Sequence, residues 1–149
     1  MEIKIRYFSK SGNTRKLADA IAEETHCTAQ DISVPLDGYT DILFLGAAVY
    51  WGGISAELKE YIRTLDKSLI GKVAVFSTSS LAQRAFPQIQ KELGKRGIAV
   101  FKENFYCRGQ FQALYHGRPN EDDARAVKKF AAERIACADT VIKRKGGGK

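Results

Sequence analysis

Three features of this sequence predict an α/β fold built on a parallel sheet. Segments with strand-like and helix-like patterns alternate from residue 2 to about residue 136. Residues 41–48 form a continuous apolar run, as expected of a strand buried on both faces of a parallel sheet. The length of 149 residues suits one domain with a sizeable core. Together these features predict a three-layer, doubly wound domain, with five parallel strands and helices on both faces.

The first half of the chain supplies three of the five predicted strands. We expect them at about residues 4–8, 28–32 and 41–48. A helix should follow the first strand over residues 13–25, because its apolar residues share one face: Leu17, Ala18 and Ile21. A proline and a glycine between the second and third strands indicate a surface connection.

The rest of the chain adds two strands and three helices. Apolar residues at helical spacing predict helices at about residues 54–65, 86–93 and 121–141. The two strands are expected at residues 72–77 and from residue 98 to about residue 106. Asn120 is a good N-cap for the last helix, whose first turn is acidic and therefore suits the positive end of the helix dipole.

The composition is that of an ordinary soluble globular protein, with 44% hydrophobic and 28% charged residues. The longest apolar run, residues 42–50, is far shorter than the ~20 residues that a membrane-spanning helix needs. No export leader precedes the first strand, so we expect a cytoplasmic protein without membrane insertion. The three cysteines, Cys27, Cys107 and Cys137, are widely spaced without a metal-like pairing, and buried or unreactive thiols are expected.

The C-terminal end is strongly basic. Of the net charge of +7, four positive charges come from Lys143, Arg144, Lys145 and Lys149. We expect residues 1–142 to form the domain and residues 143–149 to be a disordered, solvated tail. Such a tail could approach nucleic acid or an anionic membrane electrostatically. Because no recognition motif accompanies it, no specific nucleic-acid partner is expected.

The loop between the first strand and the first helix is the strongest functional signal. A strand that enters a helix through such a loop presents backbone N–H groups at the helix N-terminus, where phosphate binds. Glycine lets the backbone approach the ligand, and hydroxyls can donate to phosphate oxygens. The predicted anion ligands are Ser9, Lys10, Ser11, Gly12, Asn13 and Thr14. An ordinary surface turn is the alternative interpretation of this composition.

The sequence of this loop does not match other known kinds of phosphate-binding or phosphoryl-transfer site. It contains neither G-x-x-x-x-G-K-[ST] nor G-x-G-x-x-G. A phosphatase that attacks from such a loop would need a cysteine nucleophile, which is absent. A phosphorylated receiver domain would need clustered acids after the first strand and an aspartate after the third. Those places hold Phe8-Ser9 and Ala47-Ala48.

Aromatic residues and glycines follow the third strand. In open α/β sheets, ligands bind beyond the carboxyl ends of the strands, so this loop and the phosphate loop should share one edge. Exposed aromatic side chains there suggest that a flat ring lies against them. The residues concerned are Tyr50, Trp51, Gly52 and Gly53. Alternatively, the two aromatic side chains cover the end of the sheet.

The pattern Ser-x-Ser-Gly-Asn-Thr directly after a first strand resembles the phosphate loop of the flavodoxins, and the aromatic–glycine loop is similar to theirs. The resemblance extends over nearly the whole chain, to about residue 142. It implies the strand order 2-1-3-4-5, for which flavodoxins are themselves the standard example, and FMN as the cofactor.

The resemblance also implies roles for individual residues. The first loop would hold the ribityl phosphate, and an aromatic residue of the second loop would flank the isoalloxazine ring. Gly52, or failing that Gly53, would present a backbone carbonyl to flavin N5. Residues after the fourth strand would meet the pyrimidine edge of the flavin: Ser77, Thr78, Ser79, Ser80 and Arg84.

The chain differs from the electron-carrier flavodoxins in two ways. The loop after its fourth strand lacks their Gly-Asp and second stacking tyrosine, and its charge is basic where theirs is acidic. The leading hypothesis is an FMN-binding redox protein that passes electrons to a small acceptor or to a partner protein with an acidic docking face. The alternatives are a small NAD(P)H or quinone reductase and an adapter domain with weak or lost flavin binding. We expect a monomer or weak dimer in which no side chain acts as acid, base or nucleophile.

Overall fold

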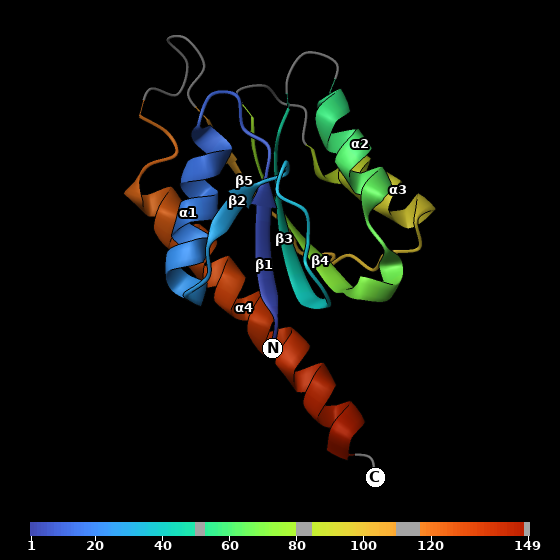
Figure 1. The fold of residues 1–149 in the computed structure, drawn as a ribbon. Coiled ribbons are helices and arrows are strands. Elements are labelled where there is room, and N and C mark those ends of the chain that lie inside the picture. Colours follow the sequence, from blue (N-terminus) through green and yellow to red (C-terminus); the bar gives the residue numbers. More distant parts are fainter. Residues whose placement is uncertain (50–52, 80–84, 110–116, 148–149) are drawn as a thin grey trace.

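A five-stranded parallel sheet with helices on both faces forms the protein (Figure 1). The computed structural model describes residues 1–49, 53–79, 85–109 and 117–147, with the backbone alone for 143–147. The strands are β1 (Ile3–Tyr7), β2 (Ala29–Asp31), β3 (Thr40–Ala48), β4 (Ile70–Ser79) and β5 (Phe105–Arg108). The helices are α1 (Asn13–Thr25), α2 (Ala56–Thr64), α3 (Phe86–Lys95) and α4 (Glu121–Gly147), with a 3-10 turn at Lys67–Leu69. Within the described chain, no helix combines the length and the apolar character that crossing a bilayer requires.

The strand order is β2-β1-β3-β4-β5, and every strand pair is parallel. The predicted fold class and strand order are therefore confirmed. Helices α1 and α4 lie on one face of the sheet, and α2 and α3 on the other (Figure 1). The carboxyl ends of β1, β3 and β4 consequently lie at one edge, next to the loop that leads into α1.

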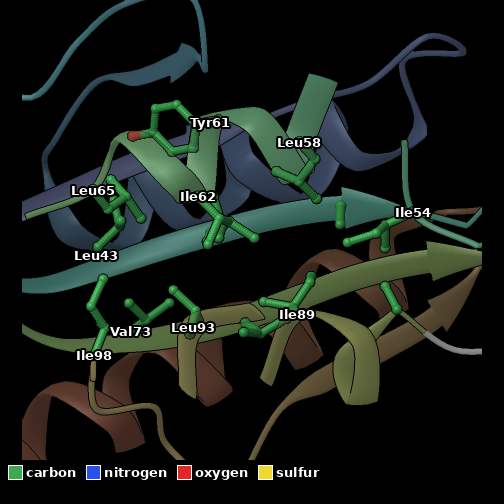
Figure 2. Packing of buried hydrophobic residues seen from close by; sticks show 14 of the residues in the cluster. Leu43, Ile54, Leu58, Tyr61, Ile62, Leu65, Val73, Ile89, Leu93 and Ile98 are labelled. Carbon is green, nitrogen blue, oxygen red and sulfur yellow. The ribbon is translucent and has the colours of Figure 1, made fainter. Parts of the chain in front are cut away.

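Both layers between the sheet and its helices are closely packed. Alternate residues of β3 pack on opposite faces of the sheet. Leu43 and Leu45 pack in the α2–α3 layer, and Ile42 and Phe44 pack in the α1–α4 layer. Figure 2 shows the first layer, in which side chains from α2 and α3 meet those of β3 and β4. Burying one such aliphatic side chain contributes about 1.5–3 kcal/mol, so these layers fix the helices on the sheet.

Two predicted segments differ in the structure. The last strand, expected from residue 98, forms continuous pairs only over β5, and Val100 makes an isolated bridge to Val73. Helix α4 continues to Gly147, through five of the seven residues that we expected to form a disordered tail (143–147 of 143–149). Residues 141–145 contain no glycine or proline, so no helix-stopping residue occurs before Gly146. Figure 1 shows this end of α4 projecting beyond the sheet.

The connection from β2 to β3, residues 32–39, crosses β1 without a helix. Parallel strands are usually joined through a helix, which then covers the sheet. Here Arg6 of β1, 2% exposed, lies beneath the connection. Its Nε donates to the Val34 carbonyl at 2.8 Å and its Nη2 to the Pro35 carbonyl at 3.1 Å. The guanidinium thus satisfies backbone carbonyls of a non-helical crossover, and no helix of the described chain covers β1 and β2 on this face (Figure 1).

The N-terminus of α4 is held by reciprocal capping. The Asp123 N–H donates to Asn120 Oδ1 at 3.1 Å, and the Asn120 N–H donates to Asp123 Oδ2 at 2.8 Å. Arg118 Nε donates to the same Asp123 oxygen at 3.0 Å. Burial pushes the pKa of Asp123 up, but the hydrogen bonds from Arg118 and Asn120 outweigh it and hold this pKa below its ordinary value of 3.8.

Because folding lowers this pKa, ionised Asp123 stabilises the folded state above about pH 4, and this contribution is lost as the pH falls through the lowered pKa. Asp123→Asn should lower the free energy of unfolding at pH 7 by about 1 kcal/mol and should make the protein less sensitive to acid. Thermal unfolding from pH 7 down to about pH 2.5 measures both effects. Asp122→Asn, at an exposed neighbouring position, is the control. An acid sensitivity equal to that of the parent would contradict the prediction.

Candidate functional site

The loop between β1 and α1 has the geometry of an anion-binding site. Gly12 is the N-cap of α1 with a left-handed φ of +87°, and no acidic side chain lies in the first turn. The Gly12 N–H donates to Ser9 Oγ at 3.0 Å, and the Asn13 N–H reaches Ser11 Oγ at 3.4 Å. The next two N–H groups, those of Thr14 and Arg15, have no acceptor among the described residues. Of these two donors, the N–H of Arg15 belongs to an exposed residue at the positive end of the helix dipole and is suited to an anion.

The loop is open at Gly12. A Cβ built on Gly12 would have no heavy atom within 4 Å in the described chain, and Lys10 and Ser11 are exposed. An anion can therefore approach the loop without displacing a described side chain. Five predicted ligands, residues 9–13, form this loop, and their contact with an anion stays a prediction.

Thr14 is placed differently from the other predicted loop ligands, because it is fully buried. Its Oγ1 donates to the Ala47 carbonyl at 3.1 Å and lies 2.9 Å from Thr78 Oγ1. The hydroxyl thus ties the first turn of α1 to β3 and β4. Our expectation that this hydroxyl donates to phosphate is corrected in this respect.

Gly46 of β3 allows α1 to lie this close to the sheet. A Cβ at this position would lie 2.4 Å from two ring atoms of Phe76 and 2.9 Å from Thr14 Cγ2. Real Cβ atoms do not approach other atoms so closely, so the position requires glycine. The sequence analysis did not identify Gly46, although an isolated glycine inside an apolar strand indicates close approach of a neighbour.

Gln88 of α3 holds the loop after β3. The Ile54 N–H donates to Gln88 Oε1 at 3.0 Å, and a Cβ on Gly53 would lie 2.4 Å from both Oε1 and Nε2 of Gln88. Gly53 also has a left-handed φ of +107°, so both space and backbone conformation favour glycine. The other predicted residues of this loop, Tyr50, Trp51 and Gly52, lie outside the described residues, and their roles stay predictions.

The end of β4 is longer than predicted. The strand continues to Ser79, so that Ser77, Thr78 and Ser79 are buried strand residues, each at most 3% exposed. The Thr78 hydroxyl faces Thr14, and Ser77 Oγ has no hydrogen-bond partner in the described structure. Contact of these three residues with a cofactor stays a prediction, and Ser80 and Arg84 lie outside the described residues.

The segment after β5 reaches the same edge. The Gly109 N–H donates to the Ser79 carbonyl at 3.3 Å, and a Cβ on Gly109 would lie 2.7 Å from Asn13 Nδ2. The side chain of Asn13 therefore packs against the backbone that follows β5. The sequence analysis missed this contact, which joins segments about a hundred residues apart in the chain.

Comparison with known proteins agrees with this geometry. A model of the flavodoxin domain matches residues 4–135. The chain belongs to the flavodoxin family. An uncharacterised protein of Methanocaldococcus jannaschii is 26% identical to it over 134 residues, which is 80% of this chain and 87% of that protein. Membership of the flavodoxin family implies a flavin cofactor, usually FMN.

Solved flavodoxins share the fold. A flavodoxin from the domain Archaea aligns with a TM-score of 0.76 at 16% identity, covering 93% of this chain and 99% of that one. Flavodoxin 1 of Bacillus cereus aligns with a TM-score of 0.69 at 24% identity, covering 91% and 98%. Rubredoxin oxygen:oxidoreductase of Desulfovibrio gigas aligns with a TM-score of 0.71 at 15% identity, covering 93% of this chain but only 36% of that one.

Cys107 of β5 lies near this edge but is a packed thiol. Burial, reinforced by the charge of Asp123, raises the pKa of Cys107 to about 12. Because the thiolate is the nucleophile, iodoacetamide at pH 8 should modify exposed Cys137 and leave Cys107 unmodified in the native protein. Mass spectrometry of tryptic peptides measures this, and denaturation before labelling should make both thiols reactive. Equal native rates at the two positions would show that Cys107 is not packed as described.

Proposed function

We propose that this flavodoxin-family protein binds FMN and passes electrons to a partner protein or a small acceptor. The observation that carries the proposal is the N-terminus of α1, where the space at Gly12 is open and the N–H groups of Thr14 and Arg15 have no acceptor among the described residues. A dianionic phosphate suits these donors, because the first turn of α1 contains no acidic side chain. Bound FMN would supply the redox chemistry, and the protein would bind and orient it.

In this proposal the loop before α1 and the loop after β3 bind different parts of FMN. The phosphate is held by the backbone of the loop before α1 and by side chains of Ser9, Lys10, Ser11 and Asn13. The flavin ring lies against the loop after β3, which contains Tyr50, Trp51, Gly52 and Gly53. Gln88 fixes the end of that loop through Ile54 and so limits its movement. No side chain is assigned a role as acid, base or nucleophile.

The charge of the protein bears on its partner. The net charge of +7 supports a redox partner with an acidic docking face, since opposite charges accelerate encounter. The expected consequence is electron transfer that slows as ionic strength rises.

Binding of FMN is tested by absorbance of the purified protein and by quenching of FMN fluorescence. We expect a yellow protein, or a colourless one that binds one FMN per chain with a Kd below about 1 µM, and weaker binding of riboflavin, which lacks the phosphate. Protein that neither carries nor quenches FMN would instead support an adapter domain. Rapid turnover of NAD(P)H with a quinone by the isolated protein would favour a reductase over a carrier.

A further inference from the structure

A groove outside the proposed FMN site lies between α2 and the connection over residues 32–39. Its volume is about 880 Å³, within the range of small-molecule sites, about 300–1,000 Å³. Apolar surface from Phe8, Ile32, Pro35 and Tyr61 lines much of it. The groove exists because the crossover from β2 to β3 contains no helix, so that this face of β1 is only partly covered (Figure 1).

Tyr61 of α2 lines this groove and has an unpaired hydroxyl. The residue is 8% exposed, and its buried hydroxyl has no hydrogen-bond partner in the described structure. Figure 2 shows the ring projecting from α2 away from Ile89 and Leu93 of α3. Burial raises the pKa of Tyr61 to about 12, so the hydroxyl stays neutral at physiological pH and can donate or accept a hydrogen bond. An unpaired buried hydroxyl costs about 1–3 kcal/mol, which a bound polar group would relieve.

The charge of the groove is opposite to that of the whole protein. Three carboxylates, those of Asp31, Glu57 and Glu60, line it together with one guanidinium, that of Arg63. Arg63 Nη1 lies 3.3 Å from Glu60 Oε2, so Glu60 is partly neutralised. In a protein of net charge +7, this local excess of negative charge favours a cationic ligand over an anionic one.

We propose that the groove binds a small, flat aromatic cation. Its rings would pack on Phe8, Pro35 and Tyr61, its polar group would pair with the Tyr61 hydroxyl, and its charge would face Glu57 and Glu60. The site does not depend on flavin. Since Phe8 directly precedes Ser9, a bound cation would lie next to the phosphate loop. That the cation would also lie close to FMN rests on the proposed function.

Isothermal titration calorimetry with two matched tricyclic probes tests the proposal. The cation is 9-aminoacridinium, and the anion is anthracene-9-carboxylate. We expect the cation to bind at least tenfold more tightly, although the net charge of the protein favours the anion. Its Kd should be the same with and without saturating FMN. Equal affinity for the two probes, or displacement of the cation by FMN, would overturn the proposal.

Substitutions at the groove should change the affinity for the cation in opposite directions. Glu57→Gln combined with Glu60→Gln should weaken binding about tenfold, and Tyr61→Phe about threefold. Arg63→Gln, which frees Glu60, should strengthen it about threefold. Glu24→Gln, at an exposed position on α1, should have no effect. Unchanged affinity in the glutamate and arginine variants would overturn the proposal.

FMN quenching by the same variants separates this proposal from the proposed function. Groove variants should bind FMN as the parent does. A protein that binds the cation but not FMN would contradict only the proposed function, and one that binds FMN but not the cation would contradict only this inference.

Discussion

Replacing Ser11 with Asp should weaken FMN binding about 100-fold while leaving the fold at least as stable. Ser11 is exposed, and its Oγ accepts the Asn13 N–H at 3.4 Å. A carboxylate can accept the same N–H and is favoured at a helix N-terminus, so thermal stability should not fall. The new charge would also lie in the proposed phosphate site. The carboxylate and each negative charge of the phosphate, about 5 Å apart, repel by about 3 kcal/mol at an effective dielectric constant near 20, so the loss in Kd should be at least about 100-fold.

Two controls separate the effect of the new negative charge from the effect of the changed side-chain shape. Ser11→Asn is nearly isosteric with the Asp variant but neutral, and it should keep FMN affinity within about threefold of the parent. Riboflavin, which lacks the phosphate, should bind the Asp variant and the parent alike. Fluorescence titration gives all the dissociation constants. If Ser11→Asp bound FMN as tightly as Ser11→Asn, the phosphate would not lie at the N-terminus of α1.

The sequence could predict the fold because its local and global signals agree. The apolar run of β3 requires burial on both faces, and hydroxyls and glycine end β1 where a helical pattern begins. The orientation of Thr14 was also predictable in principle. Thr14 precedes Leu17, Ala18 and Ile21 at helical spacing, so it shares their buried face rather than facing the ligand.

Other features of the site left no local signal. The contact of Asn13 with Gly109 joins distant segments, and nothing in the spacing of either residue indicates it. The sequence analysis expected a surface connection between β2 and β3, but it did not predict that Arg6 lies beneath this connection. Alternation along the first strand places Lys4, Arg6 and Phe8 on one face. Two of these three side chains are charged, and a strand face that packs beneath a helix is usually apolar. The structure explains this pattern, since Arg6 binds the carbonyls of the crossover and Lys4 pairs with Asp37 at 2.9 Å.

Gly46→Ala should lower the free energy of unfolding by about 3 kcal/mol, the upper end of the usual cost of overpacking a core. The added Cβ would lie 2.4 Å from the ring of Phe76, which is fully buried and cannot swing into solvent. It would also lie 2.9 Å from Thr14 Cγ2, whose hydroxyl ties α1 to the sheet. The clash should therefore shift the first turn of α1, and FMN affinity should fall severalfold together with stability.

A second substitution should relieve the clash that Gly46→Ala creates. Phe76→Leu removes the ring atoms that clash, so the double variant Gly46→Ala with Phe76→Leu should be more stable than the sum of the single effects implies, by at least about 1 kcal/mol. Gly94→Ala in α3 is the matched control, because no atom lies within 4 Å of its added Cβ, and it should stabilise the protein by about 0.5–1 kcal/mol. Urea unfolding of the four variants measures the coupling. Strict additivity would mean that β3 and α1 can separate at Gly46, and the phosphate loop would then not be fixed by the packing beneath it.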